Sequence, residues 1–593
     1  VLDLTRDPRW SRVEETFGED PVLSGILGAS MVDGLGGGNL SQKYATIATL
    51  KHFLAYAVPE GGQNGNYASV GIRDLHQNFL PPFRKAIDAG ALSVMTSYNS
   101  IDGIPCTSNH YLLTQLLRNE WKFRGFVVSD LYSIEGIHES HFVAPTKENA
   151  AIQSVTAGVD VDLGGDAYTN LCHAVQSGQM DKTVIDTAVC RVLRMKFEMG
   201  LFEHPYVDPK IAAKTVRRKE HIELARKIAQ SSITLLKNEN SILPLSKTIN
   251  KVAVIGPNAD NRYNMLGDYT APQEDSNVKT VLDGILTKLS PFRVEYVRGC
   301  AIRDTTVNEI EQAIEAARRS EVVIVVVGGS SARDFKTSYK ETGAAVAEEG
   351  SVSDMECGEG FDRASLSLLG RQQELLESLQ KTGKPLIVVY IEGRPLEKNW
   401  ASEYADALLT AYYPGQEGGN AIADVLFGDY NPSGRLPISV PRSVGQIPVY
   451  YNKKAPRNHD YVEVSSSPLY SFGYGMSYTT FEYSDLQVVQ KSARCFEVSF
   501  KVKNTGKYDG EEVSQLYMRD EYASVVQPMK QLKHFERFHL KKGEEKKVTF
   551  VLTEEDFFLV NYTLKKVVES GTFQVMIGSS SDDIRLEKSI SVE

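Results

Sequence analysis

The sequence has few cysteines, and their spacing does not match that of a metal site. Its six cysteines are scattered over 593 residues. They form no CxxC pair and no close group with histidines, which excludes a zinc or iron–sulfur centre of that kind. A chain of this size can build its own hydrophobic core without a disulfide scaffold. We therefore expect no metal site and cysteines that are mostly buried free thiols.

The sequence also lacks a positive charge balance and a long apolar run. Its formal net charge is −11, which argues against broad binding of nucleic acid, since that requires a basic field. No stretch is long and apolar enough to span a bilayer. The apolar fraction of 42% and the charged fraction of 24% are ordinary for a globular protein. A chain of this length exceeds one hydrophobic core and predicts roughly two to four domains.

The first third of the chain has the pattern of a (β/α) barrel. Residues 1–209 alternate short apolar strands with helices, which we expect near 74–89, 111–121 and 181–199. A complete barrel takes roughly 250 residues, whereas this segment offers only about five or six strand–helix units and starts inside an apolar strand. We therefore expect its N-terminal part to be missing here. A segment of the same gene product would complete it, as a bound cleaved fragment or as residues outside this sequence.

The rest of the chain changes pattern twice. After a proline-containing linker at 202–209, residues 216–454 show apolar strands that each end in a glycine-containing turn, with helices between them. This predicts a parallel sheet covered by helices on both faces. The glycine turns match neither GxGxxG nor GxxxxGK[ST], so they are read as turns and not as phosphate loops. Residues 481–593 instead alternate apolar and polar residues in short runs, which predicts an antiparallel β-sandwich.

Polar residues follow the predicted strands of the first domain. The buried run at 124–128 leads to Asp130, and the run at 48–50 leads to Lys51 and His52. Since parallel α/β folds place their chemistry at the carboxyl ends of the strands, we expect a polar pocket with a carboxylate there. Lys51 and His52 would bind hydroxyl groups, and Arg12 would reinforce them. Taken singly, an Asp at a strand end can be a helix cap, a Lys–His pair can lie on the surface, and Arg12 with Glu15 can form a surface ion pair.

A second candidate feature is a long acidic loop in the second domain. It contains Glu348 and Glu349 and continues into ECGEGFDR at 356–363. Long loops inside compact domains are usually functional or disordered, and the Phe and the Asp–Arg pair of this motif favour docking. If the loop reaches the rim, it brings a second carboxylate towards Asp130. Paired carboxylates hydrolyse glycosides, and in the retaining version they lie about 5–5.5 Å apart.

Ordered motifs along the whole chain resemble glycoside hydrolase family 3. They are DPRWSR at 7–12, KHF at 51–53, VVSD at 127–130, YPGQEGG at 413–419 and FGYGMSY at 472–478. The resemblance implies an N-terminally incomplete (β/α) barrel at 1–209 and an α/β sandwich domain at 216–454 that carries the acid/base loop. It also implies a fibronectin-III-like β-sandwich at 481–593. The expected enzyme is a cofactor-free retaining β-glycosidase of the β-glucosidase/β-xylosidase type.

The resemblance also implies roles for single residues. Asp130 matches the family's nucleophile. Glu359 is the best match to its acid/base, with Glu356 as the alternative. The positions expected to bind the sugar are Arg12, Lys51, His52, Met95 and Tyr98. An Asp that grips the sugar in the family lies upstream of all these motifs and is not in this sequence.

Departures from the family pattern bear on the sugar. Ser11 stands where the family usually has Gly, and Leu131 stands where its glucosidases commonly have Trp. The stretch PEGG at 59–62 and Leu131 favour a β-xylosidase with β-glucosidase activity over a β-glucosidase proper. The continuation after KHF lacks the His-containing loop of the branch that acts on N-acetylglucosaminides. We expect an oligosaccharide or glycoside substrate and a secreted or periplasmic location. A homo-oligomer and a non-catalytic carbohydrate-binding protein remain as alternatives.

Overall fold

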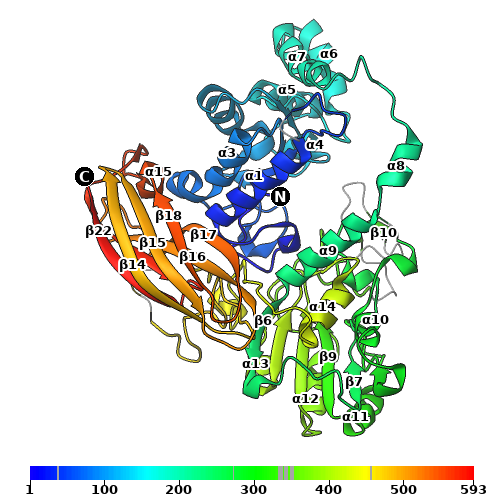
Figure 1. Ribbon diagram of the computed structural model, residues 1–593. Coiled ribbons are helices and arrows are strands. Elements are labelled where there is room, and N and C mark those ends of the chain that lie inside the picture. Colours follow the sequence, from blue (N-terminus) through cyan, green and yellow to red (C-terminus); the bar gives the residue numbers. More distant parts are fainter. Residues whose placement is uncertain are drawn as a thin grey trace. The chain divides into compact units, whose positions relative to one another are not determined.

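The computed structural model describes nearly the whole chain (Figure 1). The described residues are 1–36, 39–271, 273–331, 338–339, 345–346, 353–454, 457 and 459–593. They divide into two compact units. The first contains Val1–Trp10 and Glu15–Thr215, and the second contains Ser11–Glu14 and the described residues that follow Val216. Glu348 and Glu349 of the predicted acidic loop lie outside the described residues.

The first unit is built on parallel strands that alternate with helices. Its sheet has the spatial order β1 (Thr49–Phe53), β2 (Ser93–Thr96), β5 (Phe126–Val128). Beside β1, Leu2 donates its N–H to the carbonyl of Lys51 over 2.7 Å. Beside β5, Val161 forms a single parallel bridge with Val128. The sheet therefore continues at both edges through short segments, in agreement with the predicted alternation of strands and helices.

Residues 159–163 contribute only that one bridge to the sheet, because a side chain takes one of the hydrogen-bonding positions of β5. The N–H of Val127 donates to Oδ2 of Asp160 over 2.8 Å. Asp160 also pairs with Arg118 at 2.7 Å and with Arg191 at 2.8 Å. Burial raises the pKa of Asp160, and the positive charge of Arg118 opposes this shift. In the described part of the first unit, the parallel sheet thus has three strands, fewer than the five or six strand–helix units expected from the sequence.

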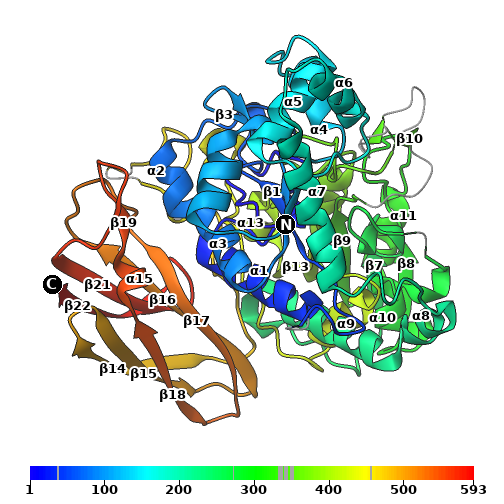
Figure 2. The same cartoon turned by 90° about the horizontal axis from the view of Figure 1, so that it is seen from above.

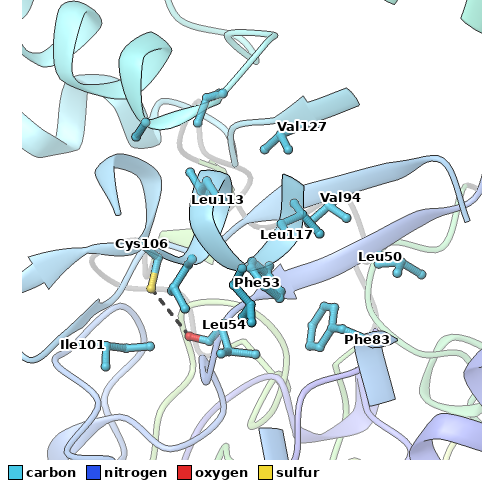
Figure 3. Packing of buried hydrophobic residues seen from close by; sticks show 14 of the residues in the cluster. Leu50, Phe53, Leu54, Phe83, Val94, Ile101, Cys106, Leu113, Leu117 and Val127 are labelled. Atoms are coloured by element: carbon cyan, nitrogen blue, oxygen red, sulfur yellow. Dashed lines mark hydrogen bonds between the residues drawn. The ribbon is translucent and has the colours of Figure 1, made fainter. Parts of the chain in front are cut away.

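Helices enclose this sheet and supply most of its core. They include α1 (Pro21–Gly36), α3 (Leu80–Asp88), the π-helix η5 (Tyr111–Glu120), α4 (Ser133–Glu139), α5 (Lys147–Ala157) and α7 (Lys182–Glu198). The three predicted helices are confirmed. They correspond to α3 together with the short helices directly before it, to η5 and to α7. Figure 3 shows Leu113 and Leu117 of η5 in one buried cluster with Phe53 of β1 and Val94 of β2. Each buried side chain of this kind stabilises the fold by about 1.5–3 kcal/mol.

The second unit begins with a six-stranded sheet covered on both faces. Its spatial order is β6 (Thr234–Asn238), β13 (Ala407–Thr410), β12 (Leu386–Ile391), β9 (Val322–Gly328), β7 (Val252–Ile255), β8 (Val294–Val297). All neighbours are parallel except β6, which runs antiparallel to β13. The apolar strands that the sequence shows in this domain correspond to β7, β9, β12 and β13, and the sheet adds β6 and β8 to them.

Alternating side chains of these strands feed two separate cores. Val254 and Ile324 pack in one cluster with α10 (Val281–Leu286) and α14 (Gly418–Leu426). The neighbouring residues of the same strands pack in the other cluster with α11 (Ile310–Arg318) and α12 (Gln372–Gln380). Figure 2 shows β7 and β8 of this sheet near α10 and α11. A strand buried on both faces reads as a continuous apolar run, which explains why these strands were visible in the sequence.

The C-terminal part of the second unit is the predicted antiparallel sandwich. One sheet consists of β14 (Phe481–Ser492), β15 (Cys495–Asn504) and β18 (Glu545–Leu552). The other has the order β17 (Gln531–Leu540), β16 (Gly510–Asp520), β21 (Gly571–Gly578), β22 (Ile584–Val592). Inward residues of both sheets form one cluster that includes Phe500, Val548 and Val575. Arg435 links the sandwich to the α/β sheet region by pairing with Glu512 at 3.2 Å.

The cysteines only partly follow the prediction. All six are free thiols, but three are buried, one is half-buried and two are exposed. Among the described residues, the helices are too short or too polar to cross a membrane.

Candidate active site

Asp130 lies at the carboxyl end of β5, as predicted, and its side chain is held on both sides. The residue is only 7% exposed. The N–H of Leu131 donates to Oδ1 over 2.8 Å. Nε2 of His52 lies 3.6 Å from Oδ2. A backbone donor and a neighbouring imidazole both favour an ionised, oriented carboxylate, which is the form that a nucleophile needs.

His52 is itself held by a carboxylate that the sequence analysis missed. Oδ2 of Asp3 accepts the backbone N–H of His52 over 3.1 Å and lies 2.8 Å from Nδ1 of its ring. Both side chains are fully buried. Asp3 stands between the buried Leu2 and Leu4. An acid inside an apolar strand was the only signal in the sequence, because its partner lies 49 residues away.

The other predicted sugar-binding residues of the first unit lie on the same sheet. Strand β1 includes Lys51 and His52. The sequence had instead predicted that the strand ends just before these two residues. Nζ of Lys51 lies 3.5 Å from Oε2 of Glu15. Met95 belongs to β2, and Tyr98, just after β2, donates its hydroxyl to the carbonyl of Leu131 over 2.9 Å. The structure therefore brings Lys51, His52, Met95, Tyr98 and Asp130 to neighbouring strands.

Aromatic rings that the sequence analysis did not select support this group. The ring centroid of Tyr56 lies 4.7 Å from that of His52 and 5.9 Å from that of Tyr98. Trp10 packs edge-on against Tyr56 at 5.2 Å. The indole N–H of Trp10 donates to Oδ1 of Asn64 over 2.7 Å. Close-packed rings leave few alternative rotamers, so they fix the orientation of His52 and Tyr98.

In the second unit, Glu359 is buried between a cation and a phenol. Its side chain is 4% exposed. Nη1 of Arg12 donates to Oε1 over 3.2 Å, and the hydroxyl of Tyr269 donates to Oε2. The N–H of Glu359 donates to Oδ2 of Asp268 over 3.0 Å, and Oδ1 of Asp268 accepts the N–H of Tyr269 over 2.7 Å. Asp268 thus fixes both Glu359 and the tyrosine that contacts it.

The loop that carries Glu359 is docked, as its Phe and Asp–Arg pair had suggested. It packs on the segment Ser11–Glu14 within the second unit. The N–H of Gly358 donates to the carbonyl of Ser11, and the N–H of Ser11 donates to Oδ1 of Asp362, both over 2.9 Å. Glu14 accepts the hydroxyl of Ser331 over 2.6 Å. Because each of the two segments donates hydrogen bonds to the other, Ser11–Glu14 and the loop form one local structure.

Glu356, the alternative acid/base, lies in a different environment. It pairs with Arg363 at 2.9 Å and with Arg394 at 3.5 Å, and all three side chains are at most 8% exposed. Arg394 also donates to the carbonyls of Glu356 and Phe361 over 2.9 and 2.8 Å. Burial raises the pKa of the adjacent Cys357 thiol well above its usual value, so this thiol stays neutral. A carboxylate held by two buried guanidinium groups anchors the loop and is poorly suited to exchange protons.

Profiles of known families match most of the chain. The profile of the glycosyl hydrolase family 3 N-terminal domain matches residues 1–195. That of the glycosyl hydrolase family 3 C-terminal domain matches residues 233–478. A fibronectin type III-like domain matches residues 512–581.

Individual relatives extend this similarity over nearly all of the sequence. A beta-xylosidase of Formosa agariphila is 39% identical, covering 98% of this chain and 80% of the relative. A periplasmic beta-glucosidase of Salmonella typhimurium is 37% identical, covering 99% of this chain and 79% of the relative. The crystal structure of a beta-glucosidase from Listeria innocua in complex with glucose has a TM-score of 0.91 and 35% identity, covering 100% of this chain and 80% of that one.

Proposed function

The chain belongs to glycosyl hydrolase family 3 and is therefore a β-glycosidase, and we propose that it is an exo-acting enzyme that retains the anomeric configuration. The predictions of the family, of a glycoside hydrolase and of the three-part fold are confirmed by the matches to both family domains and to the fibronectin type III-like domain. The finer statements on mechanism and sugar below are our proposal.

Asp130 is the proposed nucleophile, and its buried position beside His52 is the observation that carries the proposal. In the first step the Asp130 carboxylate attacks the anomeric carbon, while Glu359 donates its proton to the departing glycosidic oxygen. This gives a glycosyl–aspartate. In the second step Glu359 takes a proton from water, whose oxygen attacks the anomeric carbon and releases Asp130. Both steps use only carboxyl groups of the chain and need no cofactor.

Glu359 is preferred over Glu356 as the acid/base because of what each carboxylate touches. One guanidinium and one phenol contact Glu359, whereas two buried guanidinium groups hold Glu356. Two guanidinium groups that hold a buried carboxylate fix its position in the loop. The environment of Glu356 therefore supports an anchoring role.

The proposed sugar site combines these groups with the side chains of the sheet. Lys51 and His52 donate hydrogen bonds to sugar hydroxyls, and Arg12 adds a further donor. Met95 and Tyr98 form the apolar and aromatic wall. A pocket of this kind binds one terminal sugar unit, so that the enzyme releases single sugars from the non-reducing end of β-linked oligosaccharides.

We propose that the enzyme is a β-D-xylosidase that also has β-D-glucosidase activity. We prefer this assignment to a β-D-glucosidase proper. The support is local: Leu131 presents a branched aliphatic side chain next to Asp130, and residues 59–62 form a tight loop. A Cβ on Gly62 would lie 2.7 Å from Cβ of Arg9, so this loop lies directly against the DPRW motif. A pocket that only tolerates the hydroxymethyl group of glucose discriminates weakly, by about 10–200-fold.

The proposal extends to domains and location. The barrel domain at 1–209 supplies the nucleophile, the α/β domain at 216–454 supplies the acid/base, and 481–593 is the fibronectin-III-like domain. A secreted or periplasmic location is part of the proposal, and the similar Salmonella protein is named periplasmic.

The test compares aryl β-xylosides with aryl β-glucosides of the same leaving group. We expect a higher kcat/KM for the xyloside and measurable turnover of the glucoside. Proton NMR of the first product should show the β-anomer before mutarotation. A first-formed α-anomer would overturn the retaining mechanism, and a much higher kcat/KM for the glucoside would reverse the sugar preference.

A further inference from the structure

Asp3 makes His52 part of a buried row of three titratable side chains. Asp3 lies 2.8 Å from Nδ1 of the ring, and Asp130 lies 3.6 Å from Nε2. Asp3 and His52 are fully buried, and the side chain of Asp130 is 10% exposed. The imidazole therefore has one carboxylate at each nitrogen. His52 therefore does more than fill space in the core, because the second carboxylate at its ring is the proposed nucleophile.

The hydrogen bonds of Asp3 determine which proton His52 carries. Oδ2 of Asp3 accepts the backbone N–H of His52, and the same oxygen faces Nδ1. An ionised carboxylate can only accept, so Nδ1 carries a hydrogen. In a neutral ring this leaves a lone pair on Nε2 that faces the Asp130 carboxylate. A protonated ring instead presents N–H to it, and two flanking carboxylates favour this imidazolium form.

We propose that Asp3 is a positioning residue that keeps His52 protonated and aimed at Asp130, so that the nucleophile stays ionised in the working range of pH. This inference rests on the proposed role of Asp130. Asp3 also repels Asp130, but Asp3 bonds the opposite edge of the ring. The imidazolium is therefore nearer to the nucleophile than Asp3 is, and the nearer charge dominates.

Three further side chains of the described residues lie near the row. The ring of Tyr56 packs 4.7 Å from His52. Burial raises the pKa of Cys106, to which the charge of Asp3 also contributes, so this thiol is neutral. Lys51 is next in sequence, and its Nζ lies 3.5 Å from Glu15.

Asp3→Asn is the central variant, because it removes the charge and keeps an acceptor oxygen for both N–H groups. We expect the acid limb of kcat/KM against pH to move up by about one pH unit, since an ion partner at this range shifts a carboxyl by about that amount. For the same variant, we expect a much smaller effect on kcat/KM at the pH optimum than on the acid limb. His52→Gln removes the imidazolium while Asp3 remains, and it should move the acid limb in the same direction.

Asp160→Asn is the matched control. Asp160 is also a buried carboxylate of the first unit, but it pairs with Arg118 and Arg191. This variant should lower the melting temperature and leave the acid limb in place. If Asp3→Asn also lowers only the melting temperature, or if a folded His52→Gln keeps the wild-type acid limb, the inference is wrong.

Trapping of the wild-type enzyme separates this inference from the proposed function. A 2-deoxy-2-fluoro-β-glycoside with a dinitrophenyl leaving group should label a peptide that contains Asp130. A label on another residue would overturn the assignment of the nucleophile, and the inference with it. A label on Asp130 together with an unmoved acid limb in both variants would overturn the inference alone.

Discussion

The guanidinium of Arg12 lies 3.2 Å from the carboxylate of Glu359, although the two residues are 347 positions apart in the sequence. Their side chains are 3% and 4% exposed. A buried cation favours the ionised form of its partner, which in the proposed mechanism is the form that takes a proton from water. Arg12 was expected from the family resemblance to bind sugar. Its contact with Glu359 indicates that it also orients the proposed acid/base.

Replacing the nucleophile should remove turnover and leave the fold intact. Asp130→Ala removes the covalent step, so we expect kcat to fall by roughly 10⁴-fold or more. The measurement is hydrolysis of an aryl β-xyloside, with the melting temperature recorded in parallel. Turnover at the wild-type level in a folded Asp130→Ala protein would end this assignment.

The two loop glutamates should respond in opposite ways. Glu359→Ala should slow substrates with poor leaving groups by about 10²–10⁴-fold and affect activated aryl glycosides less. Azide should restore its activity and give a β-glycosyl azide. Glu356→Ala leaves Arg363 and Arg394 without their carboxylate and should cost about 3–5 kcal/mol of stability, with no rescue by azide. Rescue of Glu356→Ala instead would move the acid/base by three positions.

The hydroxyl of Tyr269 should influence the basic limb of the pH profile. It donates to Oε2 of Glu359, and a donor to a carboxylate stabilises its ionised form. Tyr269→Phe should therefore make Glu359 hold its proton to higher pH and move the basic limb of kcat/KM upwards. An unchanged basic limb in a folded variant would show that the hydroxyl only supports the loop.

Asp520 in the sandwich should destabilise the fold at neutral pH. Burial raises its pKa to about 6 from 3.8, and the charge of Glu569 adds to this. The folded state thus favours the protonated form of Asp520. The stability that this form contributes is fully present below about pH 4 and is lost as the pH rises through 6. Since the side chain is half-exposed, we expect Asp520→Asn to add only about 1 kcal/mol of stability near neutral pH. Melting temperatures near pH 7.5 and pH 4 test this. An equal gain at both values would contradict it.

The sequence by itself determined the fold class and most of the proposed residues. Strands such as β9 and β12 are buried on both faces, and their continuous apolar runs are legible without any partner. Alternation in β15 and β21 was equally plain, because each has one buried face. Polar residues that follow apolar runs indicated Asp130, Lys51 and His52, because such runs are read from the local sequence alone, although β1 in fact extends through Lys51 and His52.

Only the tertiary structure decided which groups touch these residues. The carboxylate of Asp3 meets His52, and Asp268 and Tyr269 meet Glu359, through contacts between segments that are 49 or more positions apart. No local period records such contacts. The different surroundings of Glu359 and Glu356 are also visible only in the structure, because the two residues share one motif and differ in the guanidinium groups around them. The hydrogen bond from the N–H of Val127 to the Asp160 side chain could not be predicted for the same reason, because a side chain there takes the place of a backbone acceptor.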